Sequence, residues 1–408
     1  MRFLNRQVEK LLSHWTVSSS SGLHLNFLDG LRGLAILMVI AGHAFYYNPA
    51  GPKFTIALGK IIGAGFMGVP IFFVLSGFLI SYPFFRARVR DPGVWYQEGY
   101  ASRRLLKILP PYYLATVVLA IFYYVRSRDP YYFTLGLEWA AGLGNFVYLP
   151  TYFNTSFWSL WVEIHFYVVL PLLFFLVRGA GVRTAGWLIF LLLAVVPPVV
   201  RQLTWPENAE LLFTQFTMRR FPCAMDNFAW GVLFAAFYVE RRGDLPKLRH
   251  LARIGYAGLL VIALSIGLFA WTDYHHELEM HPTRWYYEWS RFLPGLGAFL
   301  ALFLAFDGQS LGNRLLTAPA LRFVGIVSYE WFLIHQPVFF WVREQIGSTH
   351  GNLGFYVLSV STPVAATFLV SVLVYHYFSY PIMRRGRSKL ELKRRGDRQS
   401  AIAPRHAD

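Results

Sequence analysis

Apolar stretches of about 20 residues recur along the chain, and this repetition restricts the fold more than any other feature of the sequence. Coiled as an α-helix, a stretch of this length crosses the hydrocarbon core of a bilayer. The stretches lie near residues 31–48, 64–84, 107–126, 157–178, 185–201, 220–240, 252–272, 289–306, 322–343 and 354–380. We therefore predict an all-α fold, a polytopic transmembrane helical bundle of about ten spans.

The composition agrees with a fold that is solvated by lipid. Hydrophobic residues make up 55% of the chain and charged residues only 15%, whereas soluble domains carry roughly 25% charge. A soluble chain of this size could not bury so much apolar surface. Cys223 is the only cysteine, which excludes an intrachain disulfide and a cysteine-based metal site.

The positive charge of the chain lies between and after the apolar stretches. A net charge of +16 is also typical of nucleic-acid binding, but loops loaded with Lys and Arg mark the cytoplasmic side of a membrane protein. With about ten spans both termini lie on one side, and all the basic clusters then fall on that side too. We therefore predict cytoplasmic termini and no nucleic-acid partner. The clusters are Arg86, Arg88, Arg90, Arg103, Arg104 and Lys107, then Arg241, Arg242, Lys247, Arg249 and Arg253, then the tail from Arg384.

Three regions follow from this pattern. Residues 1–27 form a cytoplasmic N-terminal segment, residues 28–383 the transmembrane domain, and residues 384–408 a basic cytoplasmic tail that faces membrane lipid. The segment 134–150 is apolar but short and rich in glycine. We interpret it as a re-entrant or interfacial piece on the outer side, with an eleventh span as the alternative.

Ionisable residues within spans are costly, so each is a candidate functional residue. In the first span, Asp29 is placed to cap the helix and Arg32 to pair with it. His43 lies about 18 Å beyond Leu31 along the helix, in the outer half of the span. An imidazole there could take a hydroxyl proton as a general base. The alternative is a histidine that forms a hydrogen bond between packed helices.

The fourth predicted span holds Glu163 and His165, which point to different faces because they are two residues apart. Glu163 lies at a depth comparable to that of His43. Its carboxylate could orient an imidazole or bind a sugar hydroxyl, or could be protonated and bridge two helices. In the span 322–343, Gly325 permits another helix to approach closely. Glu330 and His335 in the same span need not touch, and a structural role is favoured for His335.

Arg103, Arg104 and Lys107 share one face at the cytoplasmic end of the third span. Such a cluster suits phosphate oxygens, but the residues alone favour simple anchoring to anionic lipid. The outer-loop sequence from His275 to His281 matches no zinc motif, and we expect no metal. Ser76 lacks the flanking pattern of a nucleophile elbow.

Taken together, these segments resemble acyltransferase family 3, in order and over nearly the whole chain. The stretch from Leu28 to Phe45 resembles the first-span signature of the family, with His43 at the position of its essential histidine. Arg103 and Arg104 match its arginine motif, whereas Lys107 replaces the second arginine. FWSLWVEIHFYVVLP resembles its Ser-Leu-x-x-Glu motif, and GIVSYEWFLIHQP matches a later segment more loosely.

The chain departs from the family pattern at three further positions. Pro70 stands where many members carry Asp, and Ser379 and Tyr380 stand where many carry Glu-Arg. The roles of those acids therefore cannot be carried over to this chain.

The resemblance implies an enzyme that moves an acyl group, most often acetyl, from cytoplasmic acyl-CoA to a hydroxyl of a carbohydrate or macrolide-like acceptor. It implies a multi-pass protein of the cytoplasmic (inner) membrane. The basic cluster at Arg103, Arg104 and Lys107 would face the CoA phosphates.

The resemblance also implies a role for each polar residue within the spans. His43 would be the general base or would carry the acyl group transiently. Glu163 would hold the imidazole or the acceptor, and Ser159 would add a hydrogen bond. Asp29 and Arg32 would bind substrate or support the site. The rival classes are a proton-coupled transporter or exporter and a lipid-binding scaffold.

Overall fold

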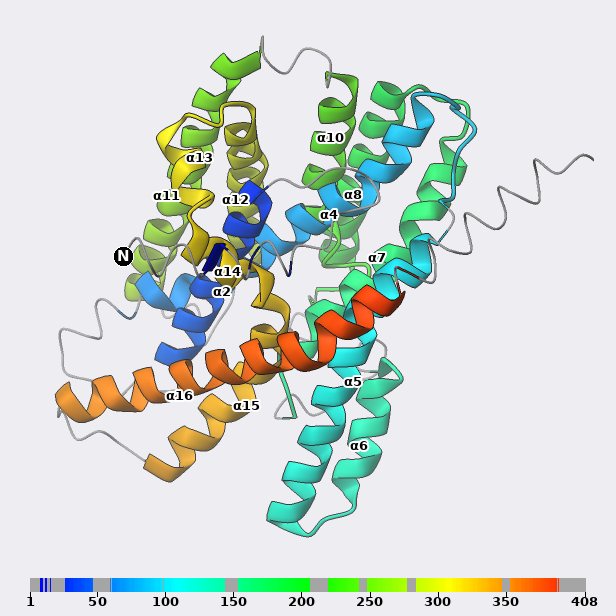
Figure 1. Cartoon of the computed structure of the whole chain (residues 1–408). Coiled ribbons are helices and arrows are strands. Elements are labelled where there is room, and N and C mark those ends of the chain that lie inside the picture. Colours follow the sequence, from blue (N-terminus) through cyan, green and yellow to red (C-terminus); the bar gives the residue numbers. More distant parts are fainter. Residues whose placement is uncertain are drawn as a thin grey trace, which may run out of the picture.

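The computed structural model describes residues 26–46, 61–97, 99–143, 153–205, 219–241, 248–276, 284–346 and 353–386, with a few single positions outside these ranges. All regular structure in these ranges is helical, which confirms the predicted all-α class for the described part of the chain (Figure 1). The long helices are α2 (Asn26–Tyr46), α4 (Gly68–Arg88), α5 (Tyr100–Ser127), α7 (Phe157–Leu176), α8 (Val182–Leu203), α10 (Asp226–Glu240), α11 (Ala252–His276), α12 (Arg284–Ala301), α15 (Ser328–Ile346) and α16 (Leu353–Val374). The short elements are η1 (Ala64–Met67), α6 (Tyr131–Ala140), η4 (Leu302–Phe306), α13 (Leu311–Leu316), α14 (Pro319–Ile326) and the π-helix η5 (Tyr375–Ser379).

Each of the ten predicted spans coincides with one long helix, in some cases extended by a short element. Within the described residues, 8 helices are long and apolar enough to cross a membrane. The other two long helices are α10 and α15. Helix α10 has only 15 residues, about 22 Å of helix, and α15 carries charges at Glu330, Arg343 and Glu344. A multi-pass bundle is thus shown, and the count of ten spans and the cytoplasmic termini stay predictions.

The apolar, glycine-rich segment 134–150 begins within a short helix. Helix α6 has 10 residues, about 15 Å of helix, which is too short for an eleventh span. It packs against α5, and the two helices form a helical hairpin, seen at the bottom of Figure 1. Residues 144–150 lie outside the described residues, and the re-entrant or interfacial placement stays a prediction.

Small residues allow two pairs of helices to cross with their backbones in contact. A Cβ atom on Gly77 of α4 would lie 2.3 Å from the carbonyl oxygen of Phe228, and one on Gly231 of α10 would lie 2.0 Å from that of Val74. Likewise a Cβ atom on Gly325 of α14 would lie 1.7 Å from the Asp29 carbonyl oxygen of α2. This confirms the close approach predicted at Gly325, and it fixes α14 and the following α15 against α2.

The predicted N-terminal and C-terminal regions lie largely outside the described residues. Trp15 is one of the described positions, and it is buried. Its indole Nε1 donates a hydrogen bond to Nδ1 of His376 over 3.1 Å, and its ring stacks on Phe323. The N-terminal part of the chain therefore contacts both α14 and the π-helix near the end of the bundle.

Candidate active site

Two histidines on different helices meet in the interior of the bundle. Nδ1 of His43, near the end of α2, lies 3.0 Å from Nε2 of His335 on α15. The other ring nitrogen of His43, Nε2, lies 2.8 Å from the amide nitrogen of Gln336. His335 is completely buried, whereas His43 is half-buried. His43 is therefore held at both of its ring nitrogens by neighbouring residues of one helix.

The residues just before α7 hold Gln336 in place. Its side-chain oxygen accepts hydrogen bonds from the hydroxyls of Ser156, over 3.0 Å, and of Thr155. The side-chain amide of Asn154 donates to the Leu333 carbonyl oxygen over 2.9 Å. Three consecutive polar residues thus fasten the start of α7 to the middle of α15, so that α2, α7 and α15 all contribute to this polar centre.

A cavity of about 70 Å³ lies between α2, α4, α5, α7 and α15, and one of its lining residues, Phe332, contacts His335. Its volume is enough for several water molecules or the end of a narrow chain, but not for a nucleotide. Basic, acidic and hydroxyl side chains line it together with an apolar wall that includes Phe72 and Phe332. The polar lining residues are Arg32, Ser76, Arg104, Lys107, Ser159, Glu163, Tyr167, Ser328 and Tyr329.

Glu163 is the acidic residue of this cavity, and its contacts are to hydroxyls. Its Oε1 accepts hydrogen bonds from Ser76 over 2.8 Å and from Tyr167 over 2.7 Å. Both ring nitrogens of His43 are bonded to α15, so the recorded contacts of Glu163 do not include the imidazole that it was expected to hold. The structure places Glu163 with the basic residues of the cavity instead.

The predicted basic cluster divides between the cavity and its surroundings. Arg104 and Lys107 line the cavity, and Arg104 also donates to the Leu79 carbonyl oxygen over 2.7 Å. Arg103 is half-buried and does not line the cavity. Arg32, which the sequence paired with Asp29, lines the cavity from α2. Three cationic side chains from two helices thus face one small space.

Other predicted residues have more local roles. Helix α2 begins at Asn26, so Asp29 lies inside its first turn and does not cap it, contrary to expectation; its charge still faces the positive end of the helix dipole. The Ser159 hydroxyl donates to the Ser156 carbonyl oxygen over 3.1 Å while lining the cavity. His165 bonds to the Trp161 carbonyl oxygen over 2.6 Å and packs outside the histidine pair.

Phe332 joins the cavity to the histidine pair. Its ring lies 5.9 Å from the ring of His335, one turn further along α15, and 6.4 Å from the ring of Phe72 across the cavity. Ser159 and Ser156 are similarly one turn apart on the α7 side. Phe332 on α15 and one turn of α7 therefore connect the cavity lining to the polar centre around His43.

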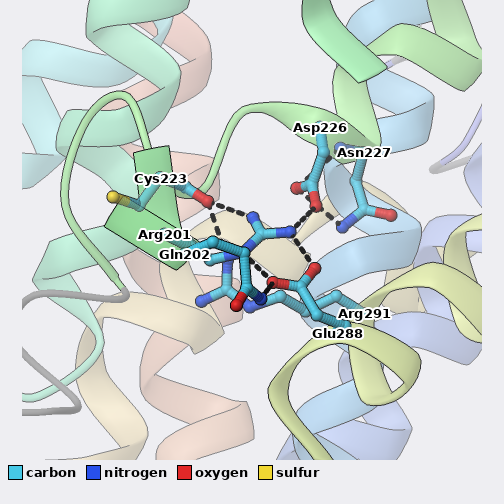
Figure 2. A network of polar contacts seen from close by, with 7 residues as sticks. All are labelled: Arg201, Gln202, Cys223, Asp226, Asn227, Glu288 and Arg291. Atoms are coloured by element: carbon cyan, nitrogen blue, oxygen red, sulfur yellow. Dashed lines mark hydrogen bonds and ion pairs between the residues drawn. The ribbon is translucent and has the colours of Figure 1, made fainter. Parts of the chain in front are cut away.

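A second polar cluster ties together α8, α10 and α12 (Figure 2). The buried guanidinium of Arg201 donates to Glu288 over 2.9 Å and to Asp226 over 2.9 Å, and also bonds to the Cys223 carbonyl oxygen. Since Arg201 binds both carboxylates, we interpret the cluster as a structural contact between the three helices.

No group of three or more metal-ligating side chains occurs within the described residues, and most of the segment 275–281 lies outside them.

The sequence did not predict that His335 and Gln336 contact His43. A histidine followed by glutamine inside an apolar stretch was the available signal, because two polar residues in a span need partners there. The partner itself could not be inferred, since His43 and His335 are separated by 292 residues.

Comparison with known proteins gives the chain a family. The model of the family described as "Acyltransferase domain" matches residues 25–376. The peptidoglycan O-acetyltransferase OatA of Listeria monocytogenes is 24% identical over 386 residues, which cover 88% of this chain and 56% of the relative. The O-acetyltransferase OatA of Staphylococcus aureus is 22% identical over 379 residues, which cover 89% of this chain and 58% of the relative.

The chain thus spans little more than half the length of these curated relatives. No solved structure matches it. The family match includes α2, which carries His43, and every element that lines the cavity. The chain therefore belongs to this acyltransferase family.

Proposed function

We propose that the protein is a membrane-bound O-acyltransferase that moves an acyl group, most often acetyl, from cytoplasmic acyl-CoA to a hydroxyl of a cell-envelope carbohydrate. The observation that carries the proposal is a histidine pair, His43 and His335, near a cavity lined by three cationic side chains. A base for a hydroxyl proton and cations for phosphate oxygens are the two groups that such a transfer needs.

The donor is proposed to enter from the end of α5 that carries the basic cluster. The cavity is too small for a nucleotide, so the nucleotide would stay at the mouth and the pantetheine arm would reach inward. Arg32, Arg104 and Lys107 would attract the phosphates, with Arg103 nearby on α5. Phe72 and Phe332 would border the thioester next to His43.

At the thioester, His43 would act as general base. Its Nε2 takes the proton of the acceptor hydroxyl while the oxygen attacks the acyl carbon. The bond from carbon to sulfur then breaks, the ester forms, and the proton returns from His43 to the thiolate of CoA. Glu163, fixed by Ser76 and Tyr167, would place a carboxylate among the cavity cations.

A carbohydrate acceptor is proposed from the names of the relatives, one of which is a peptidoglycan O-acetyltransferase. His43 lies near the end of α2 opposite to Asn26, which is the outer side if the termini are cytoplasmic. An acceptor from the outer face and a donor from the cytoplasm could then meet at His43. Because the proposed donor is made in the cytoplasm, we propose the inner membrane as the location of the protein.

The test is acyl transfer in membranes that contain the full chain. Radiolabelled acetyl-CoA is supplied together with peptidoglycan fragments, and labelled fragments are counted. We expect transfer by the wild type and a loss of at least 100-fold in His43→Ala at equal amounts of folded protein. A wild type that labels no glycan, or a His43→Ala variant as active as the wild type, would contradict the proposal.

A further inference from the structure

We infer that His335 is a positioning residue that fixes the proton of His43 on Nδ1, so that Nε2 is the atom that takes the proton of the acceptor. This inference rests on the proposed function, because it concerns the same general base. It is carried by the direction of one chain of hydrogen bonds, which runs from the start of α7 through Gln336, His43 and His335 to a backbone carbonyl.

The direction of the chain is set at its buried end. Nδ1 of His335 lies 3.0 Å from the carbonyl oxygen of Trp331, and a carbonyl oxygen can only accept a hydrogen bond. Nδ1 of His335 must therefore carry a proton. A doubly protonated imidazole at 0% exposure would carry a costly buried charge, so Nε2 of His335 holds a lone pair. That lone pair accepts from His43, whose Nδ1 must be the donor over the 3.0 Å contact.

The other end of the chain gives the same assignment. With its proton on Nδ1, neutral His43 has a lone pair on Nε2. The amide nitrogen of Gln336 lies 2.8 Å from this atom and donates to it. The amide oxygen of Gln336 in turn accepts from the hydroxyls of Ser156 and Thr155. Every donor in the chain then faces an acceptor, and His43 also donates to the Val39 carbonyl oxygen of its own helix.

The opposite direction fails at Trp331. If His43 carried its proton on Nε2, neutral His335 would donate from its own Nε2 and leave a lone pair on Nδ1. That lone pair would then face the lone pairs of the Trp331 carbonyl oxygen at 3.0 Å. Two acceptors at this distance repel each other, and the buried carbonyl would lose its side-chain partner.

The assignment gives Gln336 a role in the resting enzyme. Its amide occupies the lone pair of His43 that the acceptor hydroxyl must reach, so the hydroxyl replaces the amide when the acceptor binds. During transfer, Nε2 gains the proton and His43 becomes positively charged. The bond from Nδ1 to His335 strengthens with that charge, which stabilises the transition state more than the ground state.

The test uses two substitutions of His335 in the full chain, with transfer of acetyl from acetyl-CoA to peptidoglycan fragments as the assay. His335→Gln keeps an acceptor atom near the position of Nε2, whereas His335→Phe keeps a ring without one. We expect kcat per folded protein to fall at least 100-fold in His335→Phe and less than tenfold in His335→Gln. The KM for acetyl-CoA should change by less than about twofold in both, because other residues line the cavity.

A purely structural role would lower the yield of folded protein in both variants and leave kcat per folded protein unchanged, which would overturn the inference. Failure of the proposed function would look different, since the wild type itself would then transfer no acetyl. A second measurement does not depend on activity. In protein labelled with ¹⁵N-histidine, with His43→Gln to assign the signal, we expect the tautomer that carries the proton on Nδ1. The opposite tautomer of His43 would overturn the inference.

Discussion

Single residues in the cavity supply the charges that the proposed donor would meet. Glu163 places a carboxylate among Arg32, Arg104 and Lys107, and its Oε1 is fixed by Ser76 and Tyr167. Within a low-dielectric interior the net charge of such a group is more important than its shape. Its contact with Ser76 was not predictable, because Ser76 lies on a different helix, 87 residues away.

We expect Glu163→Gln to lower kcat/KM for acetyl-CoA at least tenfold, about 1.4 kcal/mol. The amide keeps the shape and still accepts from Ser76, but three cations then face the cavity without a counter-charge. Ser81→Ala is the matched control, because the Ser81 hydroxyl bonds to the Gly77 carbonyl oxygen of its own helix. Steady-state kinetics decide the question, and equal losses in both variants would refute a charge effect.

At the scale of the elements, backbone contact between helices sets the geometry of the site. Gly77 and Gly231 bring α4 and α10 together, and Gly325 brings α14 against α2. The position of α15, and with it the contact of His335 with His43, depends on this second crossing. The sequence indicated the close approach at Gly325, since a small residue in a span permits it. It could not indicate which helix would lie opposite.

Gly231→Ala should destabilise the bundle by about 1–3 kcal/mol, the usual cost of overpacking. The added methyl group would lie 2.0 Å from the backbone oxygen of Val74, which cannot move aside as a side chain can. Gly267→Ala in α11 is the control, because nothing lies within 4 Å of its Cβ position. Thermal unfolding in detergent compares the two, and an equal effect of both substitutions would count against the close crossing.

At the scale of the whole molecule, the sequence predicted the helical class and the approximate position of each long helix. The prediction succeeded because the length and hydropathy of an apolar stretch are local properties, and they alone decide whether the stretch can cross a bilayer. The sequence did not predict that the polar residues would divide into a histidine centre around His43 and a charged cavity around Glu163, because long-range packing decides that division. The similar depths of His43 and Glu163 suggested one site, whereas Glu163 lines the cavity and His43 does not.

The orientation of the bundle can be tested with introduced cysteines in a Cys223→Ser background. Arg90, in the loop between α4 and α5, and Asp129, just after α5, are both exposed. We expect Asp129→Cys to react with a membrane-impermeant maleimide in intact cells, and Arg90→Cys to react only after permeabilisation. The reverse pattern would place the basic clusters and the cavity mouth on the outer side, and acyl-CoA could then not be the donor.

The small volume of the cavity bears on how the acyl group is protected from water. An activated thioester beside a base is open to hydrolysis wherever water has access. A space of about 70 Å³, once filled by the end of the proposed donor, leaves little room for water among the residues that line it. Gln336 meanwhile covers the lone pair of the base until a hydroxyl replaces it. Under the proposed function, the donor would therefore be consumed mainly when an acceptor is bound, and little of it would be hydrolysed by water.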